Sequence, residues 1–522
     1  MFVNKRISLL FSLSSISHAF AQADVAAQNA TASALLYGYP LLAFEKVAPL
    51  LVSTIGANQI HHALTLSTAT DRQVVKPNVD TLYSTTVFDL SHSDVIITVP
   101  EIPRDQYALY SYYDPYGDNF ANTGTGNLEA SGQYRLTVRP NGTSSYGIQA
   151  NGSNMSQYRT TIYSPSTYGI LLIRWLVNAT NLDALHAYQN ATSVRSIARS
   201  SASPIGPYLS ELNGTNPTQT PAQSVLSLLA EFAANNGPEV TLADSTFDAN
   251  LAAAGILNGQ YSPLAGVNLT LANQTAVLAA AQVGISSLTP LNNGWTMVKQ
   301  NQTGDFGANY GLRSAIASSG YLMLKAPNAI YPSWSNASAS SPVGAATLNL
   351  GAGESLLYTF SSKPPLQQPG FWSLTAYADN YLIPNAMNVY ALGDRSKLTY
   401  AHGGRVYGIK ASTQDETFQI LVQPADVAPP ANWTSNWLPG PAGGGDISVL
   451  LRWYLAGESL LDGSYVYPVV TKQAAITVAR NGTNATTSTP TPASYTGAGD
   501  RRVAPSLTVV TGGLIMLAVV CM

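Results

Sequence analysis

Two blocks of alternating hydrophobicity, one in each half of the chain, most constrain its fold. Apolar and polar side chains alternate in residues 133–139, and residues 418–423 repeat the pattern. Because successive side chains of a strand point to opposite faces, a period of two predicts strands that bury one face against a core. Between these blocks the hydrophobic spacing changes to that of helices. The chain is therefore expected to form two β domains separated by a mainly helical segment.

Further strands are expected around both blocks. Runs rich in β-branched or aromatic residues end at Gly and Pro turns, and strands at this spacing suggest sandwiches or jelly rolls. The expected strands are residues 95–99, 107–113, 133–139, 354–360, 371–377, 405–410 and 417–423.

The middle third carries helix start signals. Thr220 precedes Pro221, which is an N-cap followed by proline at the first helical position. Residues 270–285 are a second helix candidate, and residues 447–461 are expected to form a closing helix capped by Asp446. The predicted class is α+β and rich in β structure. Its parts are a domain at 24–181, a mainly helical segment at 182–330 and a second domain at 345–475.

Composition excludes several classes of protein. Only 10% of the 522 residues are charged, against about a quarter in a typical globular protein, while the hydrophobic share is an ordinary 45%. With a net charge of −3 and thinly spread basic residues, no nucleic-acid partner is expected. A single cysteine excludes an intrachain disulfide framework and all-cysteine metal sites.

Cofactor and metal fingerprints are also missing from the sequence. It contains no Gly-x-Ser-x-Gly elbow, no P-loop and no dinucleotide fingerprint. His61 and His62 are adjacent and would diverge on a helix or strand, and no His-Glu-x-x-His spacing occurs. No cofactor and no metal are therefore expected, although a metal site built from residues far apart in the sequence stays open.

The first residues are typical of a secretory signal. Residues 1–21 combine Lys5 and Arg6 with a short apolar stretch and small residues before a cleavage point, so that Gln22 becomes the first mature residue. The alternative is a short membrane anchor, but the apolar stretch is too short to cross a bilayer.

The last residues predict a lipid anchor. Residues 481–499 form a Ser/Thr/Pro-rich stalk that suits an extended, O-glycosylated spacer. Small residues, a short polar spacer and an apolar tail are the pattern of a glycosylphosphatidylinositol (GPI) signal, with attachment between Ser494 and Gly499 and removal of residues 500–522. A plain tail anchor is the alternative. The expected location is the outer face of the plasma membrane or the cell wall, reached by the secretory pathway.

Asn-x-Ser/Thr sequons agree with export. Glycans at these positions would supply the solubility that charged residues normally give. The fourteen sequons begin at Asn29, Asn141, Asn151, Asn154, Asn178, Asn190, Asn213, Asn268, Asn273, Asn301, Asn336, Asn432, Asn481 and Asn484.

The strongest local group of polar residues is Asn78, Asp80 and Tyr83. A carboxylate buried in a cleft can act as a general base, and the catalytic candidates are Asp80, Tyr83 and Asp114. The alternative is structural, because Asn and Asp beside Pro77 suit a turn that starts a strand.

A second group lies around an aromatic and acidic segment. Tyrosine rings beside carboxylates can bind a sugar or another neutral ligand, and core packing is the alternative for the rings. Arg174 stands alone in an apolar run and needs a partner if it is buried, for which Asp80 and Asp114 are the candidates. Asp394 and Arg395 are interpreted as a polar turn. The ligand-binding candidates are Asn78, Arg104, Tyr110, Tyr112, Asp118 and Arg174.

Two long motifs resemble known families. Residues 76–84 (KPNVDTLYS) and the following 88–91 (FDLS) are similar to the signature of domain-of-unknown-function family 1254. Residues 371–377 (FWSLTAY), 393–396 (GDRS) and 451–454 (LRWY) resemble family 1214. The resemblance covers about residues 30–475 and implies two β-sandwich, jelly-roll-like domains with a helical segment between them. It implies no defined activity. The form expected here is secreted, GPI-anchored and eukaryotic.

Three functions remain open from the sequence. The favoured one is a cell-surface glycoprotein that binds a ligand or a cell-wall carbohydrate and contacts the membrane through its lipid anchor. The alternative is a surface enzyme, a hydrolase or isomerase, that acts on a small neutral molecule at a pocket near Asp80 and Arg174. The third is a structural coat protein in which every motif serves folding. The enzyme alternative predicts that Asp80, Tyr83, Arg104, Asp114 and Arg174 converge around one pocket between the β domains. The most informative observation is whether these five residues and Asn78 share a solvent-reachable cavity.

Overall fold

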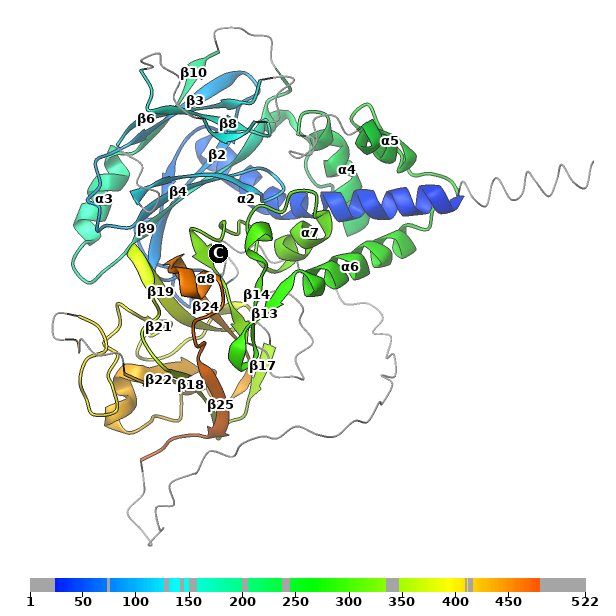
Figure 1. The fold of residues 1–522 in the computed structure, drawn as a ribbon. Coiled ribbons are helices and arrows are strands. Elements are labelled where there is room, and N and C mark those ends of the chain that lie inside the picture. The colour runs from blue at the N-terminus through cyan, green and yellow to red at the C-terminus, as the bar shows by residue number, and fades with distance from the viewer. Residues whose placement is uncertain are drawn as a thin grey trace, which may run out of the picture.

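The computed structural model describes residues 24–72, 76–125, 131–140, 145–149, 157–199, 205–236, 245–334, 347–408, 411 and 416–478. Two β-sandwiches lie one above the other, and a group of helices covers one side (Figure 1). The α+β, β-rich class with two β domains is confirmed. The predicted signal peptide, stalk and anchor signal lie outside the described residues.

The N-terminal sandwich consists of two five-stranded sheets. The first has the order β1-β2-β9-β4-β5: His61–His62, Thr81–Asp89, Tyr168–Leu176, Ala108–Tyr113 and Asn119–Gly124. The second has the order β10-β3-β6-β8-β7: Ser193–Ala198, Ser93–Val99, Gly132–Val138, Thr160–Ser164 and Gly147–Ile148. Apolar side chains of both sheets, such as Trp175 and Tyr134, fill the space between them.

The first sheet is buried on both faces. While Leu171 and Ile173 of β9 face the other sheet, Ile170 and Leu172 belong to a separate core that the helices share. This explains why β4 and β9, apart from Ser111 and Arg174, are apolar or aromatic instead of alternating. Polar side chains on this sheet are consequently removed from water.

The helices form a layer against that outer face. They are Asp24–Gly38, α2 (Pro40–Ile55), α4 (Pro221–Ala233), α5 (Ser245–Ala253), α6 (Leu269–Ser286) and α7 (Tyr310–Ser319). Helix α3 (Leu182–Ala191) lies apart from this layer and packs its Leu185 on the core between the two sheets of the first sandwich. Short strands join the helices of the layer: β11 (Ile256–Leu257), β12 (Gln260–Tyr261), β13 (Leu288–Pro290), β14 (Trp295–Val298), β15 (Ala329–Ile330) and β16 (Ser333–Trp334). The 3-10 turns of the described residues include η2 (Leu209–Glu211), η3 (Asn292–Gly294), η4 (Gln300–Gln302) and η5 (Ala431–Asn436).

The start of α4 follows its sequence signals. The hydroxyl of Thr220 accepts from the backbone N–H of Gln223, and the Gln223 side chain accepts from the backbone N–H of Thr220, so both are satisfied at the helix start. The helices 24–55 contact α4 and α7. They therefore belong to the helical layer, and the boundary expected at residue 24 for the first β domain is not where the sandwich begins.

The C-terminal sandwich pairs a six-stranded with a four-stranded sheet. In the first, β15, β24 (Gly445–Ala456), β19 (Leu366–Ala378) and β20 (Tyr381–Leu382) are successive neighbours, while β17 (Thr347–Leu350) pairs with β24 and β21 (Ala391–Gly393) with β19. The second has the order β23 (Trp437–Gly440), β22 (Phe418–Pro424), β18 (Glu354–Phe360) and β25 (Val469–Ala474). Its core contains Trp372 and Trp453.

The closing helix predicted at 447–461 is wrong in its greater part. Residues 445–456 form the long central strand β24, and only α8 (Glu458–Leu461) is helical. All residues from Ile447 to Ala456 are buried, so both faces of this strand are covered and its sequence shows no alternation. The strand predicted at 405–410 is also wrong for its described residues, where Arg405 makes only isolated bridges.

No single helix among the described residues is long and apolar enough to cross a membrane. Asp24–Gly38 and Pro40–Ile55, bent by 42°, meet the length and composition only as a pair. Buried residues of both helices, such as Leu35 and Phe44, belong to the apolar core of the helical layer.

Eight of the predicted sequons lie within the described residues. Asn273 is half-buried, and its side-chain oxygen accepts a hydrogen bond from the Tyr39 hydroxyl. The seven exposed ones are Asn29, Asn178, Asn190, Asn213, Asn268, Asn301 and Asn432.

Candidate functional site

The two β domains meet at the segment that precedes β2. Residues 76–80 lie against β19 and β24 of the other domain. Asn78 Nδ2 donates to Tyr454 Oη (2.7 Å), and Arg452 Nη2 donates to the carbonyl oxygen of Lys76 (3.1 Å). The first family motif of the sequence therefore forms the contact between the domains.

Asp80 links the two domains through its carboxylate. It is only 7% exposed, and its Oδ2 accepts from Ser373 Oγ (2.5 Å) while its Oδ1 pairs with the guanidinium of Arg395. Asn78 Oδ1 accepts from the backbone N–H of Asp80 (2.6 Å), which is the turn that the structural alternative predicts. The segment thus has both features: Asn78 starts the strand, and Asp80 reaches across to the second domain.

A pocket of about 580 Å³ opens over this ion pair. The guanidinium of Arg395 lies over the ring of Phe371 (4.6 Å) and also pairs with Asp394 (2.7 Å). Tyr390 and Trp437 contribute aromatic surface to the lining. Its hydroxyl side chains are those of Ser67, Thr68, Ser396, Thr434 and Ser435.

The pocket therefore offers hydrogen-bond acceptors and donors side by side. Burial raises the pKa of Asp394, which Arg395 opposes, and the backbone N–H of Trp372 donates to the same carboxylate (3.0 Å). Lys397 adds an exposed ammonium group at the rim. This arrangement suits a ligand that carries several hydroxyl groups.

Arg174 is not part of the pocket lining. It is completely buried on β9, where its Nη1 donates to Ser111 Oγ (3.3 Å) and Tyr113 Oη (3.5 Å), and its guanidinium faces the ring of Tyr83 (5.9 Å). Asp80, one of its two expected partners, is instead engaged by Arg395. Tyr83 and Arg174 thus lie together as predicted candidates, in a buried group rather than in an open cavity.

Arg452 of β24 approaches the same region from the second domain. It is completely buried, donates to Thr375 Oγ1 (3.2 Å) and lies 5.7 Å from the ring centroid of Tyr377. Burial, and secondarily Arg452, lower the pKa of Lys76 to about 8. Arg452 and Lys76 thus lie close to each other at the domain contact, and Arg174 interacts with the same tyrosines, Tyr331 and Tyr454, as Arg452.

Asp114 and Asp118 belong to a different centre, beside α7. The carboxylate of Asp118 pairs with the fully buried Arg313 (3.1 Å), whose guanidinium lies 4.5 Å from the ring of Tyr116. Asp114 Oδ1 accepts from the backbone N–H groups of Tyr116 and Asp118 (both 2.9 Å). Burial, and then the charge of Asp118, raise the pKa of Asp114 to about 8. Asp114, the other expected partner of Arg174, thus lies in a turn of its own.

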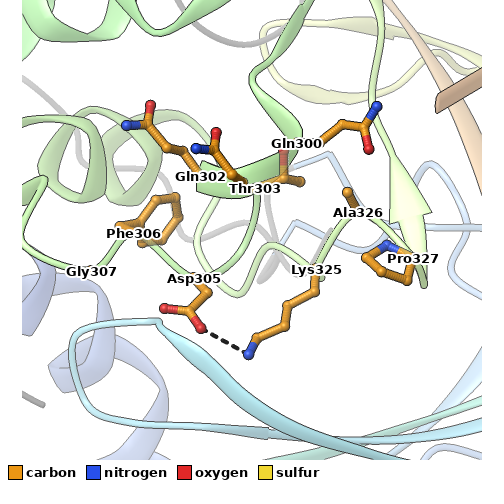
Figure 2. A pocket seen from close by; sticks show the side chains of 10 residues that line it. Gln300, Gln302, Thr303, Asp305, Phe306, Gly307, Lys325, Ala326 and Pro327 are labelled. Atoms are coloured by element: carbon orange, nitrogen blue, oxygen red, sulfur yellow. Dashed lines mark ion pairs between the residues drawn. The ribbon is translucent and has the colours of Figure 1, made fainter. Parts of the chain in front are cut away.

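A second pocket, of about 410 Å³, is lined by residues 300–303, 305–307 and 325–327 (Figure 2). Asp305 and Lys325 form an ion pair at its edge (2.8 Å), and Gln300, Gln302 and Thr303 line it. Its lining contains none of the predicted site residues. The pocket over Asp80 is therefore the one that the sequence motifs single out.

The six candidates do not converge on one cavity. Arg104 is exposed on a loop, and Asp114 lies in the centre beside α7. Tyr110 and Tyr112 are fully buried between the sheets of the first sandwich, where Tyr110 Oη bonds to Thr192 Oγ1 (3.0 Å). A ligand cannot reach these two rings, and core packing, the alternative, describes them.

The sequence interpretation missed the residues that the second domain contributes. Arg395 was assigned to a polar turn, although it pairs with Asp80 from 315 positions away. Arg452 is the only charged residue in the apolar run 447–456, which is the same signal that identified Arg174 as a candidate. It was not recognised because this run was predicted to be a helix, whereas it forms a strand. Histidines do not add a metal site: in the described residues no three His, Cys, Asp or Glu side chains come together as a metal ion requires.

Comparison with known proteins agrees with this domain order. Residues 57–196 match the family model described as protein of unknown function DUF1254, and residues 346–458 match protein of unknown function DUF1214. The chain carries DUF1254 and DUF1214 segments, in that order. The DUF1254 segment contains Asp80 and Arg174, and the DUF1214 segment contains Arg395 and Arg452. The pocket therefore lies where the two family segments meet.

One solved structure shares the fold, and a second is less similar. The VPA0106 protein from Vibrio parahaemolyticus is 14% identical, with a TM-score of 0.55, over 86% of this chain and 100% of its own. An uncharacterized protein from Burkholderia cenocepacia is 12% identical, with a TM-score of 0.39, over 87% of this chain and 96% of its own. No curated protein matches the sequence. The first of these likenesses shows a common fold and assigns no activity.

Proposed function

We propose that the chain is an exported, lipid-anchored surface glycoprotein that binds a polar, hydroxyl-bearing ligand in the pocket over Asp80 and Arg395. Cell-wall carbohydrate is the favoured ligand. The observation that carries the proposal is the pocket of about 580 Å³ at the domain contact, with a carboxylate–guanidinium pair in its lining. The sequence patterns at both ends and the exposure of seven described sequons support the surface location.

The chemistry of the lining favours a carbohydrate. Sugar hydroxyls act as donors and acceptors together, and a carboxylate beside a guanidinium meets both roles. Aromatic surface from Tyr390 and Trp437 suits the apolar C–H face of a sugar ring. The predicted Tyr-rich segment is not this surface, because Tyr110 and Tyr112 face the core.

Binding fits the geometry better than catalysis. Each oxygen of Asp80 already accepts one hydrogen bond, from Ser373 or from Arg395, which makes the carboxylate a poor general base, while its remaining lone pairs can still accept from ligand hydroxyls. The hydrolase or isomerase alternative needs Arg395 to release Asp80 when substrate enters.

A glycan array and a polysaccharide pull-down test the proposal. Asp80→Asn keeps the shape of the side chain but removes its charge, and Lys397→Ala removes an exposed rim group without touching the core. We expect both variants to weaken retention, Asp80→Asn by about tenfold or more because a charge-assisted hydrogen bond is lost. Asp305→Asn in the other pocket is the matched control and should bind like the wild type. No retention above background, or equal retention by all three variants, would refute the proposal.

A further inference from the structure

Buried hydrogen-bond donors without acceptors gather between β4 and β24, behind the pocket. Tyr107 and Tyr331 are 0% and 8% exposed, and neither hydroxyl has a hydrogen-bond partner among the described residues. The hydroxyl oxygen of Tyr454 accepts a hydrogen bond from Asn78, but no described residue accepts a hydrogen bond from that hydroxyl group. Nε of the fully buried Arg452 likewise has no partner in the described part of the chain. Unmet buried donors are rare in native proteins, so an acceptor is needed here.

These groups belong to one cluster rather than to separate defects. The rings of Tyr107 and Tyr454 meet edge to face, with centroids 5.9 Å apart. Tyr331 interacts electrostatically with Tyr454, Arg452 and Arg174. The donors therefore come from both β domains and surround the same region.

The cluster also carries an excess of positive charge. Among the described residues, no carboxylate lies within ion-pair distance of Arg452, and Asp80, the acidic group nearby, is already paired with Arg395. Lys76 contributes a further cationic group, and the lowering of its pKa to about 8 by burial and by Arg452 agrees with this excess. A buried, uncompensated guanidinium is costly, and a bound negative charge removes most of that cost.

We propose that Arg452, together with the hydroxyls of Tyr107, Tyr331 and Tyr454, binds a small monovalent anion, a carboxylate or a halide. The group consists of donors around a cation, which fits an electron-rich ligand that accepts several hydrogen bonds and donates none. A neutral sugar does not meet that description. This site is distinct from the pocket, and it does not depend on the function proposed for the pocket.

Anion-dependent stability tests the site. The full chain is dialysed against gluconate, a bulky anion, and is then titrated with formate or chloride at constant ionic strength while its melting temperature is followed. We expect the melting temperature to start rising near the Kd of the anion and then to rise with the logarithm of its concentration, because a ligand that binds only the folded state stabilises it in this way. The more effective of the two anions identifies the class, and ion chromatography of the denatured protein should recover about one equivalent.

Two tyrosine variants make the test specific. Tyr331→Phe removes a hydroxyl that has no described partner, so it should leave the gluconate form as stable as the wild type and raise the apparent Kd of the anion by about tenfold. Tyr467→Phe, the control, breaks a hydrogen bond to the carbonyl of Leu460 (2.9 Å), so it should lower stability but leave the anion response unchanged. A response that is absent, or that is equal in both variants, would overturn the proposal and assign the donors to water.

Discussion

Replacement of Asp114 by Asn should change how stability depends on pH. Burial and the neighbouring Asp118 raise the pKa of the Asp114 carboxyl to about 8 in the folded chain, against about 4 in an unfolded one. Between these values the folded state holds one proton more than the unfolded state. Because the Asp114 carboxyl has a higher pKa in the folded state than in the unfolded state, its stabilisation of the folded state is fully present below about pH 4 and is lost as the pH rises toward 8.

The size of the effect follows from that proton. One proton of difference changes the free energy of unfolding by about 1.4 kcal/mol per pH unit. The amide introduced by Asp114→Asn does not titrate, and its oxygen can still accept from the backbone N–H groups of Tyr116 and Asp118. Between pH 5 and 7 the variant should therefore gain about 2.7 kcal/mol relative to the wild type.

Urea unfolding, followed by tryptophan fluorescence at pH 5, 6 and 7, measures this difference. Glu354→Gln is the control: hydrogen bonds from Lys472 and Gly351 lower the pKa of that exposed carboxyl, so it is ionised in both states throughout the range. The difference in free energy of unfolding between Glu354→Gln and the wild type should be the same at all three pH values. If the Asp114→Asn difference were also level, Asp114 would be ionised in the fold and paired with Arg313, and the reasoning would be refuted.

Two further predictions concern packing and modification. Gly169→Ala should destabilise the first sandwich by at least about 3 kcal/mol, because the new Cβ would overlap the ring of Phe88 and the carbonyl oxygen of Tyr113. The control, Gly353→Ala, meets nothing within 4 Å and should change stability by less than about 0.5 kcal/mol. Urea unfolding of both variants measures this contrast, and equal losses of stability would contradict the prediction. Asn273 should carry no glycan after expression through a eukaryotic secretory pathway, because its side chain is half-buried and hydrogen-bonded to Tyr39. Peptide mapping after enzymatic deglycosylation measures glycan occupancy at Asn273, and high occupancy would contradict this prediction. The exposed sequons expected to be occupied are Asn29, Asn178, Asn190, Asn213, Asn268, Asn301 and Asn432.

Local sequence signals were sufficient to predict helices with a clear N-cap and strands that bury only one face. Thr220 and Pro221 predicted the start of α4, and the alternation of 133–139 predicted β6, because caps and half-buried strands leave a mark within a few residues. The sequence of strand β24 contains no such local signal. Since it is buried on both faces, its apolar run reads equally well as a helix, and the prediction failed there.

The candidate site was only half visible for a related reason. Asp80 and Asn78 stand out beside Pro77, but their partners lie 293 to 376 residues away, and no spacing rule connects such positions. A lone charge in an apolar run was the one usable signal. It located Arg174, and it would have located Arg452 as well if the run had been interpreted as a strand.

The polar groups at the domain contact support the proposed binding function. Phe371, Tyr454 and Leu455 already give that contact an apolar core shared with the helices. Buried charges such as Arg174 and Arg452 rarely improve stability over apolar side chains of similar size, because desolvation offsets their interactions. Local departures from well-satisfied packing concentrate at functional sites. Donors without acceptors on one side of Asp80 and an open, hydroxyl-lined pocket on the other therefore make this contact the place where ligands are expected to act on the protein.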